Sequence, residues 1–102
     1  MKYELNIYGE NDAVVKKYET DLARYGVFEE SIKFAELAEG KSEKEINLLA
    51  FKLAGPFCKN LFPGLTDEDC KNAVLSDMIN LIYQVCGLSA PISEATAGQE
   101  KN

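Results

Sequence analysis

The period of the hydrophobic pattern changes near Asp21, and this change constrains the fold more than any other feature of the chain. Over residues 2–8, Tyr3, Leu5 and Ile7 alternate with polar side chains, which is the two-residue period of a half-buried strand. From Asp21 onward, apolar residues recur every three or four positions, as they do in amphipathic helices. The sequence therefore predicts an α+β fold in which a small sheet precedes a set of helices.

The first part of the chain is predicted to form an antiparallel β-hairpin over residues 2–20. The turn-forming cluster Gly9-Glu10-Asn11-Asp12 separates the first strand from residues 13–20, which are rich in β-branched and aromatic side chains. A lone hairpin is only marginally stable in water. We therefore expect its apolar face to pack on a small bundle of about four helices.

The helices are predicted at about residues 21–39, 43–61, 66–72 and 76–86. Asp21 is the expected N-cap of the first helix and Ser76 that of the last, because short polar side chains accept hydrogen bonds from the first free amides. Gly40 and Gly87 are expected to follow the C-terminal ends of these two helices. The first helix is expected to bury the residues Leu22, Tyr25, Phe28, Ile32 and Ala35.

The second helix has a clear start and an internal break signal. Ser42 and Glu45 have the spacing of a capping box, and Thr66 and Asp69 repeat it before the third helix. Pro56 cannot donate a backbone hydrogen bond, so a break or kink is expected beside it. The apolar face of this helix is expected to consist of Ile46, Leu49, Ala50, Leu53 and Phe57.

The composition excludes several classes of function. The chain has 102 residues, 11 basic and 17 acidic side chains, a formal net charge of −6 and no histidine. Without histidine, the common acid–base and nucleophilic catalytic sites and most zinc enzymes are excluded. The acidic balance also disfavours binding to nucleic acid. We therefore predict no catalytic residue, no cofactor and no metal site.

Similar arguments predict the cellular location of the protein, the state of its cysteines and the extent of its folded domain. No apolar run is long enough to span a membrane, and the N-terminus lacks the apolar block of a signal peptide. Cys58, Cys70 and Cys86 are an odd number without paired spacing, so we expect buried, free thiols in a reducing cytoplasm. Residues 1–88 are expected to form one domain, and residues 89–102 a mobile, disordered tail with little to bury.

Two stretches carry a family resemblance. The first runs from Leu5-Asn6-Ile7-Tyr8-Gly9 through Val14-Val15-Lys16-Lys17-Tyr18-Glu19-Thr20 to Ala23-Arg24-Tyr25-Gly26-Val27-Phe28. The second is Phe62-Pro63-Gly64-Leu65-Thr66-Asp67-Glu68-Asp69, leading into the final helix. Over about residues 3–86, this pattern resembles the tail assembly chaperones of long-tailed phages and prophages of Gram-positive bacteria.

The resemblance implies a non-enzymatic role in the host cytoplasm. Proteins of this family bind the long, largely helical tape measure protein and keep it soluble until tail tube subunits polymerise around it. A longer form, commonly made by ribosomal frameshifting, recruits those tube subunits. The net charge of −6 would keep such a complex soluble and would suit a basic client.

Two other functions are compatible with the same residues. One is an acidic adaptor or inhibitor that binds a single folded partner, and the other is a structural head–tail component of a phage. A homo-oligomer is also compatible with the sequence. The candidate partner-binding residues are Tyr25, Phe28 and Phe51, since a large apolar side chain left outside its own core makes an interface anchor. The competing interpretation places all three in the core.

Overall fold

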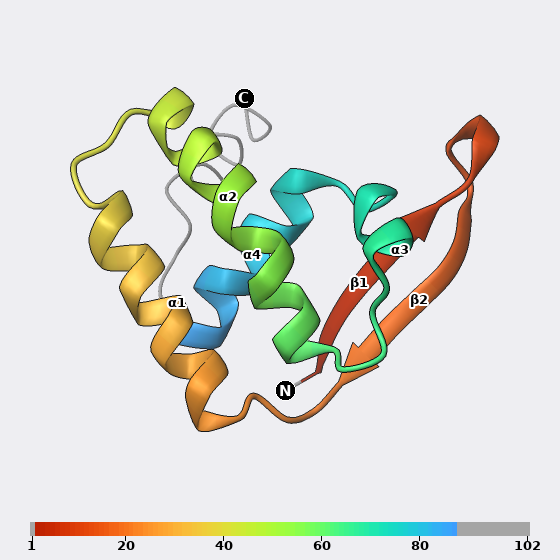
Figure 1. Ribbon diagram of the computed structural model, residues 1–102, viewed down its shortest axis with the longest axis horizontal. Coiled ribbons are helices and arrows are strands. Elements are labelled where there is room, and N and C mark those ends of the chain that lie inside the picture. Colours follow the sequence, from red (N-terminus) through yellow and green to blue (C-terminus); the bar gives the residue numbers. More distant parts are fainter. Residues whose placement is uncertain (1, 88–102) are drawn as a thin grey trace, which may run out of the picture.

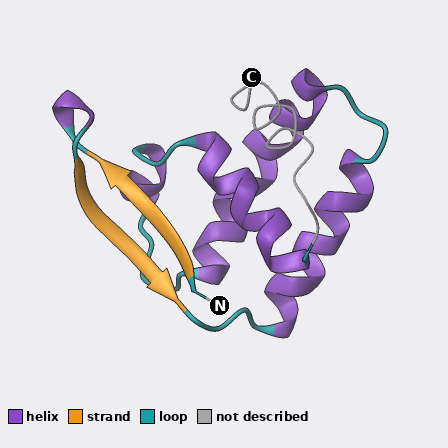
Figure 2. Ribbon diagram, turned by 180° about the vertical axis from the view of Figure 1, so that it is seen from behind, coloured by secondary structure: helices purple, strands orange, loops and turns teal. Residues whose placement is uncertain are grey.

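The computed structural model describes residues 2–87, and it confirms the predicted α+β architecture. The predicted tail at residues 89–102 lies outside this range. A hairpin of strands β1 and β2 is followed by helices α1 to α4 (Figure 1). In chain order these elements are β1 (Tyr3–Tyr8), β2 (Val14–Thr20), α1 (Tyr25–Ala38), α2 (Glu43–Leu61), α3 (Asp67–Lys71) and α4 (Leu75–Cys86). The hairpin lies on one side of the helices and α1 lies on the other, as the view from behind also shows (Figure 2).

The hairpin buries one face of β1 and leaves most of β2 exposed. Leu5 pairs with Tyr18, and Ile7 pairs with Lys16, in an antiparallel register. Leu5 and Ile7 are buried, as the alternating pattern predicted. The register shifts after Ile7, so that Val15 has no partner on β1. A side chain at Gly9 would collide with this Val15, because an added Cβ would lie 2.7 Å from its Cγ1.

Helix α4 lies at the centre of the fold, where it contacts α1, α2 and β1. The largest fully buried side chains come from every layer and include Leu5, Phe34, Phe57, Leu61, Ile79 and Ile82. The ring of Phe34 on α1 meets that of Tyr83 on α4 edge to face, with centroids 5.8 Å apart. Hairpin and helices therefore share one hydrophobic core.

The two predicted N-caps Asp21 and Ser76 are wrong. Helix α1 begins at Tyr25 rather than after Asp21, and its N-cap, Arg24, makes no side-chain cap hydrogen bond. The amide of Leu22 instead donates to the Thr20 hydroxyl oxygen at 3.2 Å, which holds residues 21–24 in a connector outside the helix. Helix α4 begins at Leu75 with Val74 as its N-cap, so Ser76 already lies in the first turn.

The predicted buried face of α1 is also wrong. The helix buries Val27, Ser31, Phe34 and Ala38 instead of the predicted set. Leu22, Tyr25 and Phe28 are exposed, while Ile32 and Ala35 are half-buried. Both stripes have helical spacing, so the sequence of α1 alone does not decide between them. The positions of α2 and α4 determine which of the two stripes is buried.

Helix α2 confirms its predicted start but not its predicted break. The Ser42 side chain accepts from the Glu45 amide, and the Glu45 carboxylate accepts from the Ser42 amide at 3.1 Å. The helix then continues through Pro56 to Leu61. The Pro56 ring lies on the exposed side, where the Lys52 carbonyl left without its usual helical donor can face water. The observed buried face consists of Ile46, Ala50, Ala54, Phe57, Cys58 and Leu61, so the predicted Leu53, which is exposed, and Leu49, which is half-buried, lie outside it.

Candidate partner-binding surface

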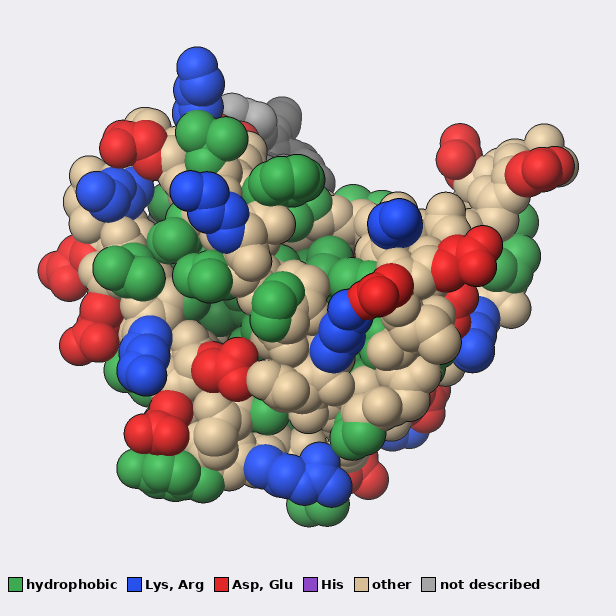
Figure 3. Space-filling view, viewed as in Figure 1, with side chains coloured by type: hydrophobic (Ala, Val, Ile, Leu, Met, Phe, Trp, Pro, Cys, Tyr) green, Lys and Arg blue, Asp and Glu red, His purple; other side chains and the backbone are tan. Residues whose placement is uncertain are grey.

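Helix α2 carries an exposed stripe that begins and ends with lysine. Its members, each three or four residues apart, are Lys44, Leu48, Phe51, Gly55 and Lys59. The Phe51 side chain is 80% exposed and Leu48 is 57% exposed. They stay outside the core because α2 already buries its opposite side against α4 and α1. On this face of the molecule, hydrophobic side chains gather over α1 and α2 among scattered basic and acidic side chains (Figure 3).

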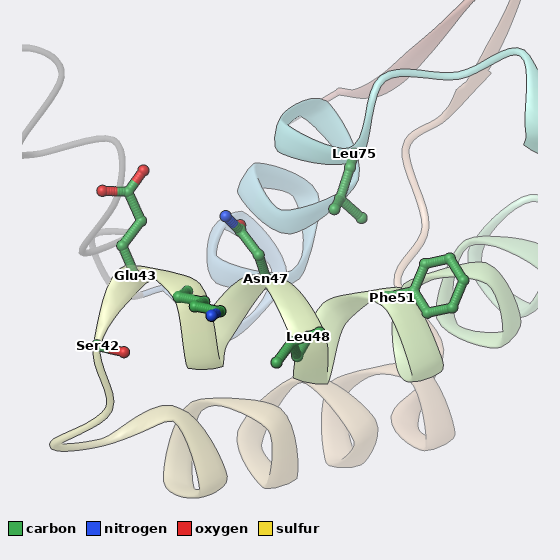
Figure 4. Close-up of a pocket in the computed structure, with 7 residues that line it drawn as sticks. Ser42, Glu43, Asn47, Leu48, Phe51 and Leu75 are labelled. Carbon is green, nitrogen blue, oxygen red and sulfur yellow. The ribbon is translucent and has the colours of Figure 1, made fainter.

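A groove runs between α2 and the segment that contains α3 and the start of α4. One end, of about 690 Å³, is lined by Leu48, Phe51 and Leu75 together with the polar start of α2. Figure 4 shows Asn47, Leu48 and Phe51 along α2, with Leu75 projecting from the start of α4. The other end, of about 450 Å³, shares Phe51 and Leu75 and continues along Ala54, Gly55, Cys70, Ala73 and Met78. We call this the α2–α4 groove.

A second, smaller groove lies between α1 and α2. Its volume is about 230 Å³. The lining residues are Glu30, Lys33, Phe34, Leu37, Leu53, Pro56, Phe57 and Ile82. Leu37 and Leu53 are exposed, whereas Phe34, Phe57 and Ile82 belong to the core. The Asn60 amide donates to the Glu30 carboxylate at 2.7 Å, so the two helices are joined beside this groove.

The three predicted binding residues are exposed, but they do not form one site. Tyr25 is 76% exposed and Phe28 is 42% exposed, so the interpretation that all three lie in the core is wrong. The expected exposure of Phe51 is confirmed, and this residue lines both ends of the α2–α4 groove. Tyr25 and Phe28 lie in the first turn of α1 and line neither groove. Whether any of them binds a partner stays a prediction.

Sequence reasoning missed several residues of these grooves. Leu48 and Leu75 line the α2–α4 groove, and Leu37 lines the smaller one. Leu48 has a signal in the sequence, since it stands off the apolar face of α2 one turn before Phe51. Leu75 has none, because only the packing of α4 against α2 brings it beside Phe51.

The three thiols of the described residues differ in burial. Cys58 is buried, and burial raises the pKa of its thiol to about 12, which keeps it protonated at neutral pH. Cys70 and Cys86 are half-buried free thiols. Within residues 2–87, no group of three or more Cys, Asp or Glu side chains is placed to hold a metal ion. The two grooves offer a partner apolar contacts and charged side chains.

Two further observations concern the membrane-spanning capacity of the helices and the comparison with known proteins. None of the helices within residues 2–87 combines the length and the apolar character that crossing a bilayer requires. Comparison of the chain with protein-family models, curated proteins and solved structures found no match. The chemistry of the two grooves is therefore the basis for assigning a function.

Proposed function

We propose that the protein is a non-catalytic chaperone of phage tail assembly that binds a helix of the tape measure protein in the α2–α4 groove. The observation that carries the proposal is the exposure of Phe51 beside an apolar groove. The sequence resemblance to tail assembly chaperones implies that the client is the tape measure protein. It also implies a role in the bacterial cytoplasm before tail tube subunits are recruited.

The dimensions of the exposed α2 stripe fit a helical client. Lys44 and Lys59 are 15 residues apart in one helix, which corresponds to about 22 Å at 1.5 Å per residue. A client helix of about four turns has the same length. Helices that dock in grooves present apolar side chains at successive turns, and Leu48, Phe51 and Leu75 offer such a helix apolar contacts.

Phe51 has the properties of an anchor for such a contact. Covering an exposed aromatic ring removes a large apolar area from water, and a few aromatic residues carry most of the energy at many interfaces. The half-buried Leu75 and the small side chains of Ala54 and Gly55 leave room beside the ring. The free protein leaves this surface in water, where it is available to an aggregation-prone helix.

Co-expression with the tape measure protein tests the proposal. The wild-type protein is expected to raise the soluble fraction of the client and to elute with it in gel filtration. Phe51→Ala is expected to abolish the complex while leaving the free energy of unfolding within about 0.5 kcal/mol of wild type, as is usual for exposed sites. Val15→Ala, which truncates an exposed side chain on the hairpin, is the matched control and should leave binding unchanged.

The opposite results would reject the proposal. If the client is equally insoluble with and without this protein, and no complex survives gel filtration, the chaperone function is wrong. If the protein is found in purified phage particles, it is a structural component instead. If Phe51→Ala costs the roughly 3–5 kcal/mol of an emptied core site, the side chain serves the fold rather than a partner.

A further inference from the structure

The α2–α4 groove is bordered by lysine although the chain as a whole is acidic. Lys44 lines one end of the groove, and Lys59 and Lys71 line the other. The acidic residues that line it are Glu43 and Asp67. Asp67 is already engaged, because its carboxylate forms an ion pair with Lys59. Within residues 2–87, neither Lys44 nor Lys71 takes part in an ion pair.

Of the carboxylates at the start of α2, that of Glu45 is committed to the helix itself. Glu45 accepts hydrogen bonds from the Ser42 amide at 3.1 Å and from the Ser42 hydroxyl at 3.0 Å. Glu43 occupies the first position of α2, where the helix dipole favours a negative charge. Lys44 therefore remains the cation available to a ligand at this end of the groove, and Lys71 is the one at the other end.

Much of the negative charge of the molecule lies on α1, while α3, beside the groove, carries three carboxylates and one lysine. Helix α1 and its C-cap carry four glutamates and one lysine, which are Glu29, Glu30, Glu36, Glu39 and Lys33. Helix α2 carries three lysines and two glutamates, which are Lys44, Lys52, Lys59, Glu43 and Glu45. At physiological ionic strength, charges more than about 8 Å apart in water are largely screened from each other. A ligand in the α2–α4 groove therefore responds mainly to the charged side chains that line it, which are three lysines and two carboxylates.

We infer that the α2–α4 groove takes an amphipathic helix whose apolar residues are flanked by aspartate and glutamate. This inference rests on the proposed function and specifies the class of helix that the groove accepts. It reverses the expectation from the net charge of −6, which favours a basic client. Acidic side chains toward the two ends of the docked helix meet Lys44 and Lys71, while its apolar residues cover Phe51.

Two labelled peptides of about 18 residues test the inference with the full-length protein. Both carry leucine at the same positions of one helical face, and the flanking positions are glutamate in one peptide and lysine in the other. Fluorescence anisotropy at 0.15 M NaCl and pH 7 is expected to show about tenfold tighter binding of the glutamate peptide. Raising the salt to 0.5 M should reduce this preference, because added ions screen the lysines.

Charge-reversal variants show which lysines cause the preference for the glutamate peptide. Lys44→Glu and Lys71→Glu are each expected to lower the preference for the glutamate peptide several-fold. Lys33→Glu changes the net charge by the same amount on α1, outside the α2–α4 groove, and should leave the preference nearly unchanged. An equal effect of all three variants would mean that the overall charge, not the groove, sets the preference, and this would overturn the inference.

The two proposals fail in different ways. If the lysine peptide binds as tightly as the glutamate peptide or more tightly, and Phe51→Ala weakens both, the groove binds helices but the inference about charge is wrong. If neither peptide binds the wild-type protein, the groove is not a helix-binding site, and the proposed function is rejected together with the inference.

Discussion

At the scale of single residues, Gly87 and Gly55 differ in whether their backbone conformation requires glycine. Gly87 follows α4 with a φ of +80°, in the left-handed region where other residues are strained. Gly55 lies inside α2 and has no positive φ. Apart from its two chain neighbours and the backbone of α2, a Cβ added to Gly55 would meet only the Cys70 sulfur, at an ordinary contact distance of 3.7 Å. The fold therefore requires glycine at residue 87 but not at residue 55.

Replacement of each glycine by alanine should change stability to a different extent. Gly55→Ala is expected to leave the free energy of unfolding within about 1 kcal/mol of wild type, because the better helix propensity of alanine is opposed by the contact of its Cβ with the Pro56 ring. Gly87→Ala is expected to lower it by about 1 kcal/mol or more, since alanine must adopt the left-handed conformation. Urea denaturation followed by circular dichroism measures both values. A loss of several kcal/mol in Gly55→Ala would show that the backbone at this position has no room for a methyl group.

The three cysteines should differ in reactivity. At pH 8, iodoacetamide is expected to modify Cys70 and Cys86 in the native protein and Cys58 only after unfolding, because burial keeps the Cys58 thiol protonated. Mass spectrometry of tryptic peptides reads each site separately. A helix bound in the α2–α4 groove should protect Cys70, which lines it, and leave Cys86 as reactive as before. Rapid native modification of Cys58 would contradict the packing of α2.

At the scale of secondary-structure elements, the short helix α3 connects the hairpin to the helices. The Tyr18 hydroxyl on β2 donates to the Asp69 carboxylate at 2.5 Å, and the Lys16 ammonium lies 3.0 Å from the same oxygen. The hydrogen bond from Tyr18 and then that from Lys16 lower the pKa of Asp69. The Tyr8 amide also donates to the Asn72 carbonyl at 3.0 Å. Side chains and backbone thus both hold α3 against the hairpin.

This connection should depend on pH. The lowered pKa of Asp69 means that the ionised carboxylate stabilises the fold above its ordinary pKa of 3.8, and that this contribution is lost as the pH falls through the folded-state value. Asp69→Asn is therefore expected to be less stable than wild type at pH 7, with a difference that shrinks below about pH 4. Glu68→Gln, on the same helix, is the control. A constant difference between pH 7 and pH 3 would show that the loss is not electrostatic.

The elements were predictable where a local side-chain signal defines them. Ser42 with Glu45 and Thr66 with Asp69 fixed two helix starts, because each pair makes its hydrogen bonds within one turn. The starts of α1 and α4 follow Arg24 and Val74, whose side chains make no cap hydrogen bond, so their sequences contain no such signal. Tertiary packing sets these starts, and it also selects which of two helical stripes α1 buries.

At the scale of the whole molecule, the hairpin and the helices should unfold together. Leu5 is 1% exposed and belongs to the same core as the helical residues. Leu5→Ala is expected to lower the free energy of unfolding by about 2–5 kcal/mol. The helical signal in far-ultraviolet circular dichroism and the tyrosine fluorescence should then lose their native values at the same lower urea concentration. A helical signal that keeps its wild-type midpoint would show that the helices fold without the hairpin.

The candidate site was predictable only in part, because it is a property of the whole molecule. The exposure of Phe51 could be inferred from α2 alone, since the residue stands off the apolar face. The groove beside it could not, because Leu75 and Cys70 reach it from a distant part of the chain. The net charge does not describe this groove for a similar reason, as it sums the acidic α1 with the lysines of α2.

The passage of α2 through Pro56 has a consequence for how the helix moves. Gly55 and Pro56 are the two weakest helix formers, and Pro56 supplies no amide proton for the Lys52 carbonyl. Amide hydrogen exchange should therefore be fastest around these residues and slower in the following turn, which Phe57 and Cys58 anchor in the core. We therefore expect the half of α2 that carries Leu48 and Phe51 to open separately from the half beyond Pro56. A bound helix would appear as slowed exchange confined to that first half.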